Sequence, residues 1–234
     1  MPRIHGGFRG GRIRGGQLRA ALYFDALQCN GRVLVPGTWS REEQPDLAAQ
    51  KILDGAAQAF IDLGVSGAGM GEIARYAGCS RGTLYRYFKN RHELHLAFVN
   101  DRAMRLAAEL RVELHDIDDP AEQLCEYIVR AVQKVRRNPA MAAWFEPGES
   151  GLAARMSRGS EVIGCLADAF VSNLQGTRPD TPPGGMRARW MVRVIVSILT
   201  MPGDSEEEER AMIERFVVPA VLSNTDRGLS RLAT

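Results

Sequence analysis

Residues 73–91 carry the sequence IARYAGCSRGTLYRYFKNR. Ala74 and Ala77 allow close packing, and Gly78 can end a short helix because a left-handed turn strains glycine least. Ser80 can then cap a second short helix. Two short helices that meet at a tight turn form a helix-turn-helix, whose second helix enters the major groove of DNA. The stretch therefore predicts a DNA-binding unit.

The second helix of this unit is predicted over residues 81–88. Leu84 and Phe88 lie four residues apart and can face a core, which leaves other side chains facing outward. Arginine can read guanine edges, threonine can contact a thymine methyl group or a phosphate, and tyrosine hydroxyls can bond to the DNA backbone. The alternative is an ordinary basic surface helix, which the turn and the spacing disfavour. The predicted DNA-contacting residues are Arg81, Thr83, Tyr85, Tyr87, Lys89 and Arg91.

The formal net charge of +2 hides an uneven distribution of charged residues. Residues 1–45 hold seven arginines against three acidic residues, whereas residues 102–234 hold 17 basic and 19 acidic residues. Residues 73–92 contain five arginines and lysines and no aspartate or glutamate. Such a local basic surface matters more to a polyanion than the net charge does, and it supports the DNA-binding prediction.

The same region, from about residue 47 to residue 95, resembles the DNA-binding domain of the tetracycline-repressor (TetR) family. The signature of that family ends in Thr-Leu-Tyr-x-Tyr/His-Phe, a pattern that here runs from Thr83 to Phe88. Arg91 stands where the family most often has lysine, and Lys89 adds a second cation. The resemblance implies a homodimer, a nine-helix subunit and a C-terminal domain that binds a small inducer.

One departure from the family lies at the start of the first helix of the motif. The family usually has serine or threonine there, whereas this chain has Ala68-Gly69-Met70-Gly71. Glycine can cap a helix but offers no side-chain oxygen. A looser helix start is therefore expected, and no DNA contact is assigned to it.

Apolar spacing typical of helices continues along the chain, and no segment alternates as a strand does. The chain is therefore predicted to be all-α, with an N-terminal three-helix helix-turn-helix DNA-binding domain and a C-terminal helical ligand-binding and dimerisation domain. The expected domains are a basic, poorly ordered arm over residues 1–45, the DNA-binding domain over 46–95 and the effector-binding and dimerisation domain over 96–234. Helices are expected at 47–63, 70–76, 81–88, 90–114, from 119 onward, and at 138–145, 152–174, 186–201 and 205–222.

The arm leaves three interpretations open. It can lie along phosphates or enter a minor groove, as arms of some DNA-binding domains do. It can equally be a passive tail, or a misassigned start codon can have added it, with translation beginning near Val33 or Val35.

The resemblance places the dimer interface in the last two helices, as a four-helix bundle with their twofold mates, and their broad apolar faces agree. It also implies an effector pocket, for which large pliable or aromatic side chains are available, although ordinary core packing is the alternative for each. The expected effector is hydrophobic. The candidate pocket residues are Met141, Trp144, Phe145, Met156, Phe170 and Trp190.

These expectations combine into a DNA-binding transcriptional regulator, a repressor that binds a palindromic operator as a dimer and is released by a ligand. Two alternatives keep the same fold: an activator, and a sensor without a small ligand. A helical enzyme is the third alternative. His92 and His95 lie outside an HExxH motif, and residues 148–151 fall short of the GxSxG pattern, so no catalytic residue, metal site or cofactor is predicted.

The four cysteines are far apart in sequence and form no CxxC pair, and no secretory signal precedes them. A reducing cytoplasm is therefore the expected location. Charges, glycines and prolines interrupt every apolar stretch before it reaches the roughly 18 residues that a membrane span needs, so no membrane association is expected.

Overall fold

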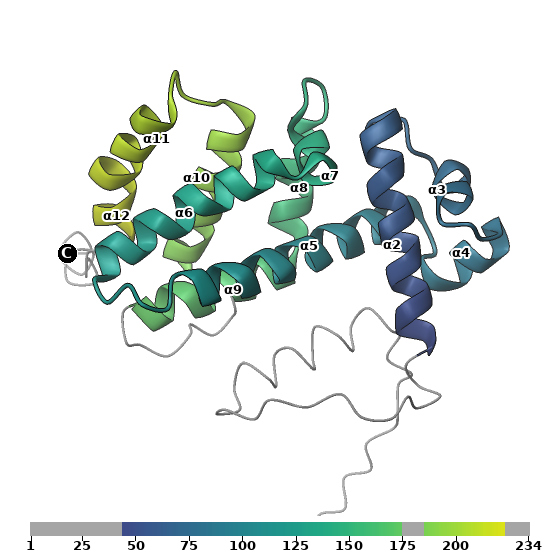
Figure 1. The fold of residues 1–234 in the computed structure, drawn as a ribbon, viewed down its shortest axis with the longest axis horizontal. Coiled ribbons are helices and arrows are strands. Elements are labelled where there is room, and N and C mark those ends of the chain that lie inside the picture. The colour runs from purple at the N-terminus through teal and green to yellow at the C-terminus, as the bar shows by residue number, and fades with distance from the viewer. Residues whose placement is uncertain (1–43, 175–184, 223–234) are drawn as a thin grey trace, which may run out of the picture. The chain divides into compact units, whose positions relative to one another are not determined.

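The computed structural model describes residues 44–174 and 185–222 (Figure 1). Every regular element within these two ranges is a helix, which confirms the all-α prediction. The helices of the DNA-binding region are α2 (Gln44–Leu63), α3 (Met70–Tyr76) and α4 (Arg81–Tyr87). They are followed by α5 (Arg91–Glu113), α6 (Pro120–Arg137), α7 (Pro139–Ala142), the 3-10 helix η1 (Ala143–Phe145), α8 (Ser150–Gly159), α9 (Glu161–Leu174), α10 (Met186–Thr200), α11 (Glu206–Met212), the π-helical turn η2 (Ile213–Val217) and α12 (Val218–Leu222).

The chain forms two units, Met1–Lys51 and Ile52–Thr234. Of the first unit, the structure describes only residues 44–51, which form the beginning of α2. The predicted arm therefore lies, up to residue 43, outside the described residues, as does the predicted loop at 176–185 up to residue 184. Everything below concerns the second unit.

Local signals in the sequence predicted where most of these helices begin. Asn90 accepts a hydrogen bond from the backbone N–H of Glu93 at 2.8 Å, and Asp119 accepts one from Glu122 at 3.0 Å. Such caps satisfy N–H groups that the first turn of a helix leaves without a partner. The predicted starts of α5 and α6 are confirmed, and Ser205 caps α11 in the same way.

The prediction of one helix over residues 152–174 is wrong, because the chain forms α8 and α9 with a break at Ser160. Ser160 has an extended backbone, and its Oγ accepts a hydrogen bond from the N–H of Ile163 at 3.0 Å. The same hydroxyl donates to Asn100 Oδ1 on α5 at 2.7 Å. A helix that ends at Gly159 and restarts at a serine cap is therefore held in place by α5.

A large core cluster lies between α6, α9, α10, η2 and α12, and among its fully buried members are Leu124, Ile128, Met191 and Ile213. These helices supply apolar stripes at helical spacing, which bury best against one another. None of the helices in the described ranges is long and apolar enough to cross a membrane.

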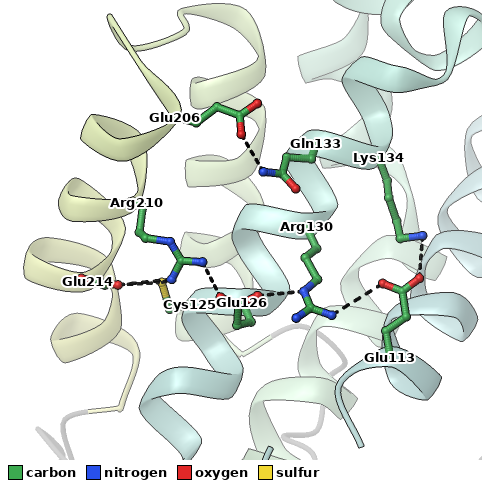
Figure 2. A network of polar contacts seen from close by, with 9 residues as sticks. All are labelled: Glu113, Cys125, Glu126, Arg130, Gln133, Lys134, Glu206, Arg210 and Glu214. Carbon is green, nitrogen blue, oxygen red and sulfur yellow. Dashed lines mark hydrogen bonds and ion pairs between the residues drawn. The ribbon is translucent and has the colours of Figure 1, made fainter.

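Ion pairs fix α11 against α6 at the edge of this cluster. Figure 2 shows Arg210 of α11 reaching Glu126 of α6, whose carboxylate also accepts from Arg130 Nε at 2.7 Å. The two guanidinium groups hold the pKa of Glu126 below its usual range, although burial opposes them. The network continues to Glu113 of α5, whose Oε1 lies 2.7 Å from Lys134 Nζ of α6.

Candidate nucleic-acid interface

The two faces of α4 differ as the sequence predicted. Leu84 is fully buried and Phe88, directly after the helix, is 7% exposed. Arg81 and Tyr85 are exposed, and Ser80 caps the helix by accepting from the N–H of Thr83 at 3.0 Å. The turn before it has Gly78 at φ +64°, the left-handed conformation that favours glycine. The helix is therefore rigidly held while one side remains open to a partner.

Arg81 lies over the start of α3. A Cβ atom built on Gly71 would come within 2.1 Å of Arg81 Nη2, so only a residue without a side chain leaves room for the guanidinium in this position. The N-cap of α3 is Gly69, which makes no side-chain cap bond. Glycine at position 71 thus leaves space for the Arg81 guanidinium, a link that the sequence alone did not reveal.

The other predicted contact residues differ in exposure. Lys89 is exposed, whereas Thr83 and Tyr87 are half-buried. The Thr83 hydroxyl lies 3.0 Å from Ser80 Oγ, so part of its hydrogen-bonding capacity serves the cap.

Two exposed arginines were missed as contact candidates. Arg75 on α3 and Arg86 on α4 are both exposed, and each guanidinium lies over the ring of the following tyrosine. The sequence signal that could have identified them is the stretch of residues 73–92 without acidic residues. They add two exposed positive charges to the helix-turn-helix.

Arg91, a predicted DNA contact, makes hydrogen bonds within the protein. Its Nη2 donates to the backbone carbonyl oxygens of Val65 and, at 2.7 Å, Ser66. Its Nε donates to His95 Nε2 at 3.3 Å. The guanidinium therefore holds the loop between α2 and α3 from within the protein, so we do not count it among the proposed DNA contacts.

Glu149, just before α8, holds the same loop. Its carboxylate accepts from the backbone N–H and from the Oγ of Ser66, both at 2.6 Å. Gly64, at φ +72°, begins this loop and lies beside the Glu149 carboxylate. The helix-turn-helix is thus tied to the C-terminal helices through a charge-assisted contact.

An aromatic cluster makes a second connection between the two regions. The Phe60 ring of α2 meets the rings of His95, Phe98 and Trp144 edge to face, with centroids 5.4, 5.0 and 5.4 Å away. Burial, assisted by the charge of Arg91, lowers the pKa of His95 from 6.5 to about 4. His95 is therefore a neutral member of the cluster at neutral pH.

A cavity of about 150 Å³ lies next to this cluster, among α5, α6, α9, α10 and the segment from α7 to α8. Three of the six candidate pocket residues, Met141, Trp144 and Phe145, line it.

The other three candidates lie elsewhere. Met156 is buried in packing, Phe170 stacks on Tyr127 with centroids 3.9 Å apart, and Trp190 is 46% exposed. Apolar periodicity identified these residues as large side chains on helix faces, but it does not distinguish a cavity wall from a core or an exposed surface. Phe98 and Arg102 of α5 line the cavity and were missed.

An exposed basic helix, packed through a tight turn against a second short helix, defines a helix-turn-helix DNA-binding protein. Residues 52–98 match the family model described as bacterial regulatory proteins, tetR family. A relative from Mycobacterium tuberculosis (strain ATCC 25618 / H37Rv), described as uncharacterized HTH-type transcriptional regulator Rv1255c, is 44% identical over 183 residues. The alignment covers 78% of this chain and 90% of the relative. The chain therefore belongs to the TetR family of bacterial transcriptional regulators, and it is not an enzyme.

Solved structures show the same fold. The TetR family repressor AlkX from Dietzia sp. strain DQ12-45-1b has a TM-score of 0.58 at 20% identity, over 80% of this chain and 97% of AlkX. RolR in complex with resorcinol has a TM-score of 0.58 at 19% identity, over 79% of this chain and 97% of RolR. In both, the likeness extends beyond the DNA-binding domain to the C-terminal helices.

Proposed function

We propose that the protein is a dimeric repressor that binds a palindromic operator and leaves it when a hydrophobic small molecule occupies the cavity. The observation that carries this proposal is that Phe98 and Trp144 line the cavity and also contact Phe60 of the DNA-binding domain. A ligand that changes the position of these rings acts directly on α2. An effector that binds better to a dimer with unsuitable spacing shifts the population away from the DNA-bound state.

The effector is proposed to be hydrophobic because the cavity is lined mainly by aliphatic and aromatic side chains. Pockets for small molecules generally combine such walls with a few polar groups. RolR, a protein of similar fold, was solved with resorcinol bound. The fold therefore accommodates a small organic ligand in at least one other protein.

A homodimer is proposed because large apolar side chains are exposed on α10 and on the helix formed by α11 and η2. Met186, Trp190 and Phe216 are 75%, 46% and 64% exposed. Large contiguous exposed apolar patches are rare on monomeric proteins and mark interaction sites. Two recognition helices related by a twofold axis could then read two half-sites about one DNA turn apart, or a multiple of it.

Replacing Phe216 with glutamate should weaken the dimer at least tenfold, because a buried unpaired charge would replace an aromatic contact at the interface. Analytical ultracentrifugation over a range of concentrations measures the dissociation constant. Val112→Glu is the matched control, since Val112 is 68% exposed on α5, outside the proposed interface. Equal dissociation constants for both variants and the unmodified protein would rule out this interface.

Genome-wide mapping of bound DNA would supply the operator and its promoter. On that operator, Tyr85→Ala should lower affinity about tenfold whatever the base sequence, because we assign Tyr85 to the DNA backbone. Arg81→Ala should instead relax discrimination at one base position, by about 1–3 kcal/mol, because we assign Arg81 to a base edge. Fluorescence anisotropy with operator variants measures both.

Arg111→Ala is the control for these two variants, because Arg111 is exposed on α5, away from α4. Equal losses at every sequence from both Tyr85→Ala and Arg81→Ala would contradict the assigned roles. Promoter output tests the direction of control: removing the gene should raise it. A fall would show that the protein activates transcription.

A further inference from the structure

Two residues that line the cavity each carry a buried hydrogen-bond donor without a partner. Within residues 44–174 and 185–222, the buried side-chain nitrogens that make no hydrogen bond are Arg102 Nε and Trp144 Nε1. Both residues line the same cavity. Leaving a buried donor unpaired costs free energy, so native proteins seldom do so, and each case requires an explanation.

We propose that these donors select the effector: an uncharged, mainly apolar molecule with one six-membered ring and a hydrogen-bond-accepting oxygen. This inference rests on the proposed effector cavity and adds the chemical class of its ligand. The size follows from the cavity volume of about 150 Å³. An apolar cavity of roughly that volume holds a molecule such as benzene.

The hydrogen-bond-accepting oxygen of the ligand is inferred from the polar side chains of the cavity wall. Apart from Arg102 and Trp144, the polar side chains of the wall are those of Tyr127 and Ser157. Burial raises the pKa of Tyr127 to about 12, so the phenol stays neutral. A ligand oxygen that accepts from Trp144 or Arg102 would satisfy a donor that the protein itself leaves unpaired, and a pure hydrocarbon would not.

The absence of charge on the ligand follows from the surroundings of Arg102. Its Nη2 lies 3.2 Å from Asp54 Oδ1, and its Nη1 lies 3.8 Å from Asp101 Oδ2. The guanidinium also lies over the ring of Phe98, 5.1 Å from the centroid. Two carboxylates already balance this cation, so a ligand carboxylate would enter an apolar cavity without a counter-charge, which is costly.

Access to the donors requires a small movement, because both nitrogens are buried. Met141 belongs to the same wall, and its unbranched side chain adapts readily to a new shape. Trp144 also meets Phe60 and His95 edge to face. A ligand oxygen bound to the indole N–H would therefore act on a residue that contacts the DNA-binding domain.

The test compares three probes of similar shape on the purified full-length protein, without DNA: toluene, benzaldehyde and benzoate. Isothermal titration calorimetry should give benzaldehyde a dissociation constant at least tenfold lower than those of toluene and benzoate. Equal affinity for toluene and benzaldehyde, tightest binding of benzoate, or binding of none of the three would overturn the inference. Operator binding of the same sample is measured separately. A sample that binds the operator but shows no preference for benzaldehyde would contradict the inferred ligand class and leave the DNA-binding function intact.

Trp144→Phe keeps an aromatic ring and removes the indole N–H. The variant should lose most of the preference for benzaldehyde over toluene, while its affinity for toluene falls by less than threefold. Equal weakening for both probes would show a structural role only and would overturn the assignment of Trp144. Arg102→Lys keeps the charge near Asp54 but removes the Nε donor, and it should reduce the same preference if Trp144→Phe does not fold.

Discussion

Replacing Gly55 with alanine is expected to lower the free energy of unfolding of the DNA-binding domain by about 2 kcal/mol. Gly55 lies within α2, and a Cβ atom there would come within 2.5 Å of the backbone nitrogen of Ala77 and 2.6 Å of its Cα. These are backbone atoms that cannot rotate away, and overpacking a dense interior costs about 3 kcal/mol. The better helix propensity of alanine returns about 1 kcal/mol of that.

Gly164→Ala is the matched control. Gly164 also lies within a helix, α9, but no atom outside its immediate neighbours lies within 4 Å of the built Cβ. Alanine there should stabilise the protein by up to about 1 kcal/mol through helix propensity alone. Urea unfolding followed by circular dichroism measures both variants, and stabilisation by both would show that the α2–α3 contact does not need glycine.

Gly55 also illustrates which features the sequence could predict. From the sequence alone, a glycine inside a helix is expected only to destabilise that helix, because glycine has a low helix propensity. Its reason lies in Ala77, 22 residues further on, which packs against α2 without leaving room for a side chain. The starts of α4, α5 and α6 were predictable because their capping residues act over three or four positions.

Some functional residues could likewise be identified from their neighbours in sequence, whereas others depend on contacts with distant residues. Arg81 and Tyr85 were identifiable because Leu84 and Phe88, four residues apart, take the buried side of α4 and leave the remaining large side chains for the surface. Arg91 was assigned to DNA from its charge, although its guanidinium turns to the carbonyls of Val65 and Ser66. The cavity shows the limit most clearly, since only the packing of several helices decides which large side chains border an empty volume.

Acidification is expected to destabilise the protein through His95, which is 3% exposed. Its Nε2 accepts a hydrogen bond from Arg91, and its ring meets those of Phe60 and Trp144 edge to face. A proton on this nitrogen would remove the acceptor and place a buried cation beside Arg91. Burial first, and then the charges of Arg91 and His92, therefore lower the pKa to about 4, against a smaller opposite effect of Glu149.

The direction of the pH effect on stability depends on how many protons the folded and unfolded states bind at His95. The unfolded chain binds a proton at His95 below about pH 6.5, whereas the folded protein does so only below about pH 4. Between these values the unfolded state holds more protons, so stability falls as the pH falls. The loss attributable to His95 should reach about 2 kcal/mol at pH 5 relative to pH 7.5, because one pKa unit corresponds to about 1.36 kcal/mol.

His95→Gln isolates this contribution, because the glutamine amide oxygen can accept from Arg91 but does not titrate in this range. Urea unfolding at pH 7.5 and pH 5 gives the loss of unfolding free energy between these pH values for each protein. Titrating carboxylates contribute to the loss in the unmodified protein and in the variant alike. The unmodified protein should lose about 2 kcal/mol more than the variant. Equal losses would mean that His95 is protonated in the folded state at pH 5, and the aromatic cluster between the cavity and α2 would then tolerate a charge.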